Sequence, residues 1–291
     1  DLVTGVQTCA LPILGVLDRE KLLQVKPPVA TDAELATIHS IDYIAQVRAA
    51  SSDANSTDPA TIANIASVYE AVGLGTEDCP VFADLHESSA RIAGGSLAAA
   101  KAIWSGQVDR AVNFAGGMHH AQRSMASGFC IYNDAALAIQ HMLDQGAERI
   151  AYVDLDAHHG DGVEQAFVND PRVLTISVHE TGLLLFPGTG FAKDIGGPQA
   201  EGYAVNVAVP ASVGDAGYLR AVHAVVPQLL RSFGPEVLVT QHGADGHRHD
   251  PLADLNLSVD GQRQLMIDAS DWAEDFAGGK WLALGGGGYS P

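Results

Sequence analysis

The sequence predicts one α/β domain with a mainly parallel sheet and helices on both of its faces. From residue 87 onward, short apolar runs alternate with longer segments of helical periodicity. Strands that alternate with helices form parallel sheets that are buried on both sides. No repeat, low-complexity linker or change of composition divides the 291 residues. A single domain is therefore expected, because α/β folds of this length are common.

The expected elements follow in a regular order. Four segments have the 3.6-residue apolar periodicity of helices: 87–104, 134–145, 216–233 and 261–276. Six apolar runs have the length of strands: 111–114, 149–155, 172–178, 204–209, 236–241 and 281–285. Pro27–Pro28 and the polar stretch 51–59 are expected to be surface loops.

Composition and charge exclude several classes of protein. The chain has 35 acidic and 16 basic residues, a net charge of −19 that repels phosphate backbones and anionic lipids. No apolar run reaches the roughly 18 residues that a membrane-spanning helix needs. The three cysteines are too few and too scattered for a disulfide framework. The sequence predicts a cytoplasmic protein without nucleic-acid or membrane partners, and it indicates no oligomeric state.

Both ends of the chain are unusual. Residues 1–13, DLVTGVQTCALPI, fit neither a helix, a strand nor a secretory signal, and they resemble a translated adaptor sequence. We expect a non-native leader there, with the domain at 14–291. The chain stops at GGGGYSP, directly after a strand-like run. These features predict a domain fragment that is truncated at both ends.

Ionisable side chains cluster after three of the predicted strands. Asp154, Asp156 and His158 follow one strand at i, i+2 and i+4, which places them on one face of an extended chain. A divalent cation would compensate their burial, provided the chain curls to bring two of them onto one ion. Asp245 offers a third ligand from another strand end, and three ligands leave a coordination position open. Other interpretations are a solvated acidic loop, or a ligand among three nearby histidines: His242, His247 and His249.

Two adjacent histidines follow a pair of glycines and suggest acid–base chemistry. Once Asp156 is assigned to the metal, two carboxylates of the segment DLDAHHGDG are left without a role, Asp154 and Asp161. Each could accept a proton from one imidazole and raise its basicity. The two pairs that include His119 and His120 would then supply a general base and a general acid beside the metal. The alternative is one structural and one solvent-exposed histidine.

Five motifs together identify a family resemblance. AGGMHHAQRSMASGFCIYND, YVDLDAHHGDGVEQAF, LFPGTG and LGGGGY resemble successive signatures of the zinc-dependent histone deacetylase superfamily. QHGADGHRHDPLADLNLS resembles its bacterial acetoin-utilisation (AcuC-like) branch. The resemblance covers residues 14–291. It implies an arginase/deacetylase-type fold with an eight-stranded, mainly parallel sheet, and hydrolysis of the acetyl amide of acetyl-lysine in proteins.

The resemblance also implies a role for each motif residue. It makes three residues ligands of Zn²⁺ or Fe²⁺: Asp156, His158 and Asp245. It makes five residues catalytic, with His120 as general base, His119 as its partner, Asp154 and Asp161 as their orienting carboxylates, and Tyr289 as the hydroxyl donor to the oxyanion. A structural K⁺ would bind backbone carbonyls near Asp154, Asp156 and His158, close to Ser177.

The implied substrate contacts surround an acyl-lysine tunnel. Phe129 and Phe186 would form its walls, and the Gly128 carbonyl would accept the substrate amide. Leu252 would lie at the rim, where Asp78 would hold the peptide backbone. Acetylated proteins are the expected partners. Three alternatives remain: an acetylpolyamine or other small acetylamide hydrolase, a binuclear manganese ureohydrolase, and an inactive acyl-lysine binding module.

Overall fold

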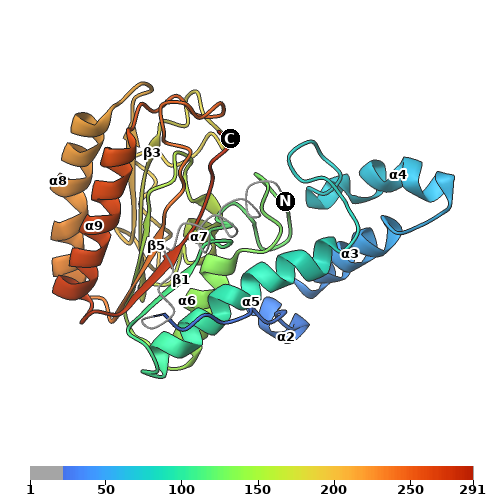
Figure 1. Cartoon of the computed structure of the whole chain (residues 1–291), viewed down its shortest axis with the longest axis horizontal. Coiled ribbons are helices and arrows are strands. Elements are labelled where there is room, and N and C mark those ends of the chain that lie inside the picture. Colours follow the sequence, from blue (N-terminus) through green and yellow to red (C-terminus); the bar gives the residue numbers. More distant parts are fainter. Residues whose placement is uncertain (1–21, 291) are drawn as a thin grey trace.

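The computed structural model describes residues 22–290, in which a six-stranded, entirely parallel sheet lies between two layers of helices (Figure 1). The leader predicted at 1–13 lies outside the described residues. The strands are β1 (Arg110–Asn113), β2 (Ile150–Asp154), β3 (Val173–Glu180), β4 (Ala204–Val209), β5 (Val237–Gln241) and β6 (Trp281–Leu284). Their order across the sheet is β1-β6-β5-β2-β3-β4.

Helices cover each face of the sheet. On one face lie α8 (Asp215–Phe233) and α9 (Val259–Phe276), and on the other lie α5 (Leu85–Trp104) and α6 (Asp134–Asp144) (Figure 1). The remaining helices are α2 (Asp32–Leu35), α3 (Ile41–Asp53), α4 (Pro59–Tyr69), η1 (Glu70–Val72) and α7 (Asp161–Ala166). None of the helices in the described part of the chain is both long and apolar enough to cross a membrane.

The sheet and its helices bury two apolar cores. Every residue of the central strands β2, β3 and β5 is buried, whereas edge strand β1 alternates between exposed and half-buried positions. Apolar residues of α5 and α6 pack on one face, and those of α8 and α9 pack on the other. In the register of the sheet, Asp154 at the end of β2 lies beside Ser177 on one side and Gln241 on the other. The carboxyl ends of these strands therefore form one edge.

The structure confirms the predicted α/β class and corrects its details. Each of the six apolar runs forms one strand, so the expectation of eight strands is wrong for residues 22–290. That number came from the resemblance and not from the apolar runs, of which the sequence analysis counted six. The stretch 51–59 is only partly a loop, because α3 continues to Asp53 and α4 begins at Pro59. Asp58 caps α4 by accepting a hydrogen bond from the Ala60 amide, and proline suits the first helical position.

Candidate metal centre and active site

The candidate site is built by loops that follow five neighbouring strands. The loop after β2 carries Asp156 and His158, and the loop after β5 carries Asp245. The segments after β1, β3 and β6 carry the histidine pair, Phe186 and Tyr289. In a parallel sheet all of these segments leave from the same edge, which is where α/β proteins bind their ligands.

The chain curls immediately after β2. The Asp156 amide donates to Asp154 Oδ1 at 3.2 Å, and the His158 amide donates to Asp156 Oδ1 at 3.0 Å. Each carboxylate thus binds the backbone two residues onward, which is the usual behaviour of aspartate in turns. The curl separates the side chains that a straight strand would align. Asp154 turns toward the histidine pair, whereas Asp156 and His158 face Asp245.

Three of the predicted residues come together as a group that could hold a metal ion. One ligand atom of each of Asp156, His158 and Asp245 lies within 4.8 Å of the others. His158 Nδ1 is 3.1 Å from Asp156 Oδ1 and 2.9 Å from Asp245 Oδ2. All three side chains are buried. The structure therefore directs two carboxylate oxygens and one imidazole nitrogen at a common point.

Hydrogen bonds fix the carboxylates in orientations that suit a divalent ion. Asp156 Oδ2 accepts from Gln241 Nε2 at 2.8 Å and from the Gly287 amide at 3.0 Å. Asp245 Oδ1 accepts from the Ala157 amide at 2.9 Å. The other oxygen of each carboxylate faces the imidazole. Two Asp oxygens and one His nitrogen are a ligand set that Zn²⁺ or Fe²⁺ accepts, so the residues present fit such an ion.

The electrostatics of this group also indicate a cation. Burial and the negative charge of Asp156 raise the pKa of Asp245 to about 7. Burial acts to lower the pKa of His158, but its hydrogen bonds to the two carboxylates outweigh burial and raise the pKa to about 10. Two buried carboxylates thus attract positive charge to this position. A divalent ion would supply that charge directly.

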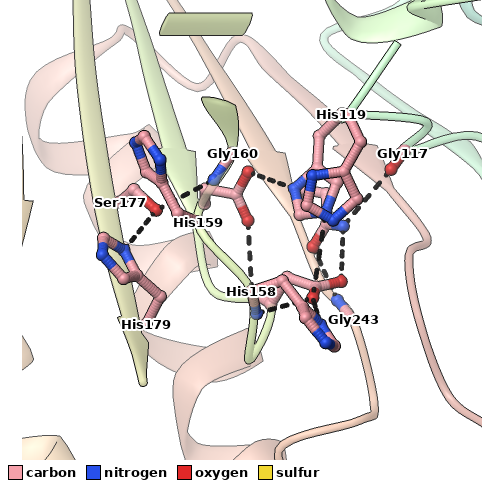
Figure 2. Close-up of polar contacts among 12 residues, drawn as sticks. Gly117, His119, His158, His159, Gly160, Ser177, His179 and Gly243 are labelled. Carbon is pink, nitrogen blue, oxygen red and sulfur yellow. Dashed lines mark hydrogen bonds and ion pairs between the residues drawn. The ribbon is translucent and has the colours of Figure 1, made fainter. Parts of the chain in front are cut away.

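The adjacent histidines each bind their own carboxylate, as the sequence predicts. His119 Nδ1 lies 2.8 Å from Asp154 Oδ2, and His120 Nδ1 lies 2.7 Å from Asp161 Oδ1. Figure 2 shows the first of these contacts beside His158 and Gly243. With Nδ1 donating to an aspartate, Nε2 of each ring is left to face the site.

The two rings differ in their electrostatic surroundings. Burial acts to lower the pKa of His119, but the charges of Asp154 and Asp156 prevail and raise it to about 9. Burial and the neighbouring charge of His119 lower the pKa of His120 to about 4, against the opposing effect of Asp161. The pair therefore combines a cationic ring with a neutral one.

Tyr289 follows the four glycines after β6 and lies beside Phe129. Their ring centroids are 5.4 Å apart. Burial raises the pKa of the Tyr289 hydroxyl, and the charges of Asp156 and Asp245 raise it further. The hydroxyl is therefore a proton donor within the field of the metal-ligand group.

The predicted tunnel residues lie around the histidine pair. The Phe186 ring stands edge-on to the ring of His120, with centroids 4.9 Å apart. Gly128 is packed between them, because a Cβ added there would come within 2.8 Å of the Phe186 ring. Phe129, the next residue, has a φ of 66° and half of its surface exposed. Both phenylalanines thus contact a residue of the site, His120 or Tyr289, while part of each side chain is exposed to solvent.

The two predicted rim residues, Asp78 and Leu252, form hydrogen bonds with other residues of the chain. Asp78 Oδ2 accepts from the Gly128 amide at 3.0 Å, and Asp78 Oδ1 accepts from Thr76 Oγ1 at 2.7 Å. Leu252 is exposed, and its amide donates to Asp250 Oδ1 at 2.9 Å. Asp78 therefore supports the tunnel-wall segment, a contact that the sequence did not predict.

The competing histidines lie elsewhere. His242 Nε2 pairs with Thr240 Oγ1 at 2.7 Å, and the tilted rings of His247 and His249 lie beside each other, with centroids 5.3 Å apart. Within residues 22–290, only the Asp156, His158 and Asp245 group meets the geometry for a metal. This geometry favours Asp245 over the three competing histidines as the third metal ligand.

Ser177 lies where the resemblance expects a structural K⁺. Its hydroxyl accepts from the Gly160 amide at 3.3 Å and contacts His179 Nδ1 at 2.8 Å (Figure 2). The rings of His159 and His179 lie 4.8 Å apart on this side, away from the metal-ligand group. Binding of K⁺ near Ser177 remains a prediction.

Several supporting residues escaped the sequence analysis. The Tyr152 hydroxyl donates to Asp154 Oδ2 at 2.6 Å, and Gln122 Nε2 donates to Asp161 Oδ2 at 2.8 Å. Asp134 accepts from the Gly117 and Met118 amides and so holds the glycine loop before the histidine pair. Only Tyr152 had a sequence signal, since it precedes Asp154 by two residues on the same strand face.

Comparisons with known proteins agree with these motifs. The chain matches the family model described as the histone deacetylase domain over residues 7–291. It is 42% identical to the acetoin utilization protein AcuC of Bacillus subtilis over 265 residues, which are 91% of this chain and 66% of that protein. It is 38% identical to AcuC of Staphylococcus aureus strain MSSA476, over 95% of this chain and 68% of that protein. The chain thus spans about two thirds of the length of these relatives.

A solved structure shows the same fold. The crystal structure of an HDAC homologue from Aquifex aeolicus superposes with a TM-score of 0.83 and 31% sequence identity, over 97% of this chain and 71% of the other. These matches confirm the resemblance to the family and to its acetoin-utilisation branch. The chain belongs to the histone deacetylase family.

Proposed function

We propose that the protein hydrolyses the acetyl amide of Nε-acetyl-lysine in proteins and releases acetate, with one Zn²⁺ or Fe²⁺ ion at Asp156, His158 and Asp245. The observation that carries the proposal is the placement of two His–Asp pairs, both with buried imidazoles, directly beside the metal-ligand group. A metal site alone fits many hydrolases. Adjacent imidazoles with different charges suit a reaction that needs both a base and an electrostatic or acid partner.

The side chains of the site divide the chemistry among them. When bound, a divalent ion would polarise the acetyl carbonyl and lower the pKa of a water toward 7. Neutral His120 would take a proton from the attacking water at Nε2, because Asp161 holds its Nδ1–H. Cationic His119 would stabilise the negative charge that develops. The Tyr289 hydroxyl would donate to the carbonyl oxygen as it becomes an oxyanion.

The proposed acyl-lysine path runs past the two phenylalanines. A slot between Phe129 and Phe186 would accept the four-carbon stem and the neutral acetylamide, whereas a free ammonium would lose its hydration there. Asp78 and the net charge of −19 favour acetyl-lysine sites with basic neighbours. Acetylated proteins in the cytoplasm are therefore the proposed partners, and the Leu252 rim would contact them.

The test is a direct comparison of substrates with a metal-loaded sample. We expect turnover of acetyl-lysine peptides with a higher kcat/KM than that of acetylpolyamines, and none with Asp156→Asn. The exposed Asp254 offers a matched control, since Asp254→Asn also removes one negative charge but leaves the ligand group intact. A preference for acetylpolyamines would support the small-amide alternative. Two bridged ions and hydrolysis of a guanidinium substrate would support a ureohydrolase. Metal and substrate binding without turnover would indicate a binding module.

A further inference from the structure

Asp250 connects the rim of the candidate tunnel to the tyrosine of the site. One carboxylate oxygen, Oδ1, accepts from the Leu252 amide at 2.9 Å, and the other, Oδ2, accepts from the Tyr289 amide at 2.8 Å. The first contact is local, two residues along the chain. The second joins the loop after β5 to the segment after β6, 39 residues away. A single side chain therefore binds both segments.

The position of Tyr289 needs such an anchor. The tyrosine follows Gly285 to Gly288, a run without side chains whose last member has a φ of 151°. Glycine restricts the backbone less than any other residue, so the run by itself does not define where the tyrosine points. The Ala244 amide binds the Gly287 carbonyl at 2.6 Å and fixes the middle of the run. Asp250 then fixes the residue that carries the hydroxyl.

We propose that Asp250 is a positioning residue, which sets the placement of the Tyr289 hydroxyl and couples it to the Leu252 rim. This inference rests on the proposed function, because the hydroxyl matters only if it meets a reacting carbonyl. Asp250 itself contacts backbone amides and no reacting atom. A charged acceptor suits this task, since hydrogen bonds to a carboxylate are about twice as strong as neutral ones.

Variants of Asp250 separate its two contacts. Asp250→Ala removes both acceptors. Asp250→Ser keeps a short acceptor that can bind the Leu252 amide in a local turn but cannot extend to the Tyr289 amide. Asp250→Asn keeps two polar atoms and only one acceptor oxygen. Asp254→Asn, four residues away on the same loop, controls for the loss of one negative charge near the rim.

Backbone amide exchange tests the contacts without reference to activity. We expect exchange at the Tyr289 amide to become at least about tenfold faster in Asp250→Ala and Asp250→Ser, since a lost hydrogen bond of about 1.4 kcal/mol corresponds to tenfold. The Leu252 amide should keep its protection in Asp250→Ser. Unchanged exchange at Tyr289 in both variants would overturn the inference, even if the protein proved to have another activity.

Kinetics then test positioning against a merely structural role. In the wild-type background we expect Asp250→Ala to lower kcat by about 10- to 100-fold, because displacing an oxyanion donor cannot cost more than the 10²–10³ of removing it. In the Tyr289→Phe background the same substitution should lower kcat less than about twofold, since no hydroxyl remains to be placed. Asp250→Asn should recover part of the loss. Equal losses in both backgrounds would overturn the inference. Absence of hydrolysis in the wild type would instead overturn the proposed function.

Discussion

The imidazole rings of His119 and His120 lie only 4.0 Å apart, centroid to centroid, yet their pKa values shift in opposite directions. Each ring is buried, so desolvation acts against the charged form of both. His119 faces two carboxylates and gains charge, whereas His120 faces the charged His119 and stays neutral. Two titratable groups with divergent environments are typical of divided acid–base roles.

His120→Ala tests the proposed base. We expect kcat to fall by about 10²–10⁴, the range for a positioned general base, with the metal content unchanged. His119→Ala should also lower kcat, through lost electrostatic stabilisation. Steady-state kinetics and metal analysis of the same samples provide the measurement. The exposed His223, far from the site on α8, supplies the control His223→Gln. Near wild-type turnover in His120→Ala would exclude its role as the base.

Metal binding should depend on Gln241 as well as on the three ligands. Gln241 Nε2 holds Asp156 Oδ2, so Gln241→Leu leaves a ligand without its orienting contact. We expect the metal affinity to fall about 10- to 100-fold, as for other residues that orient ligands. Asp245→Asn should weaken binding further. Competition with a chelator measures the affinity, and Gln264→Leu on α9 is the matched control. Unaltered affinity in both site variants would contradict the assigned centre.

Tyr289→Phe separates substrate binding from chemistry. The substitution removes one hydroxyl and keeps the ring that packs on Phe129. We expect kcat to fall by about 10²–10³ with little change in metal content, because the donor acts on the oxyanion. A change confined to KM would mean that the hydroxyl only binds the ground state.

The sheet could be predicted from the sequence because each buried parallel strand is a short, nearly continuous apolar run. All six apolar runs became strands, and the four predicted helices occur with ends shifted by at most two residues. Helix α3 was missed although Tyr43, Ile44 and Val47 follow a helical spacing and are buried. Helix α4 was also missed, and it leaves apolar residues such as Val68 exposed. Apolar periodicity in a sequence arises because one face of a helix is buried. Prediction from periodicity therefore fails for a helix that buries few residues.

Proximity within the site could be predicted only in part. Asp156 and His158 are close in sequence, and strand order brings the loop of Asp245 to the same edge. The contact of Asp250 with Tyr289 depends on how two loops fold back, which no local pattern encodes. The role of Asp78 as a support for Gly128 was hidden for the same reason.

Stability should depend on the protonation of His39. This buried ring binds the Gln122 carbonyl through Nδ1 and accepts from the Asn133 amide at Nε2, each at 3.0 Å. Burial lowers its pKa to about 4. Between pH 6.5 and 4 the unfolded chain therefore binds a proton that the folded protein does not. The resulting loss of stability, about 1.4 kcal/mol per pH unit, begins as the pH falls below 6.5.

Denaturant unfolding from pH 7.5 to 5 measures this contribution of His39. His39→Gln offers a side chain that can donate and accept but does not titrate. We expect the difference in unfolding free energy between wild type and variant to shrink by about 1–2 kcal/mol over this range. A difference that stays constant with pH would refute the assignment.

Asp78 should affect peptides more than small acetylated amines. Its two oxygens already bind the Gly128 amide and the Thr76 hydroxyl, but each carboxylate oxygen can accept more than one hydrogen bond. Asp78→Asn keeps an acceptor for Gly128 and removes the charge that would hold peptide N–H groups. We expect kcat/KM to fall about tenfold or more for an acetyl-lysine peptide, since a charged hydrogen bond contributes about 1.5–3 kcal/mol. A small acetylamine, which lacks those N–H groups, should lose less than threefold. An equal loss for both substrates would mean that Asp78 only supports the tunnel wall, and the protein-substrate proposal would lose its main recognition element.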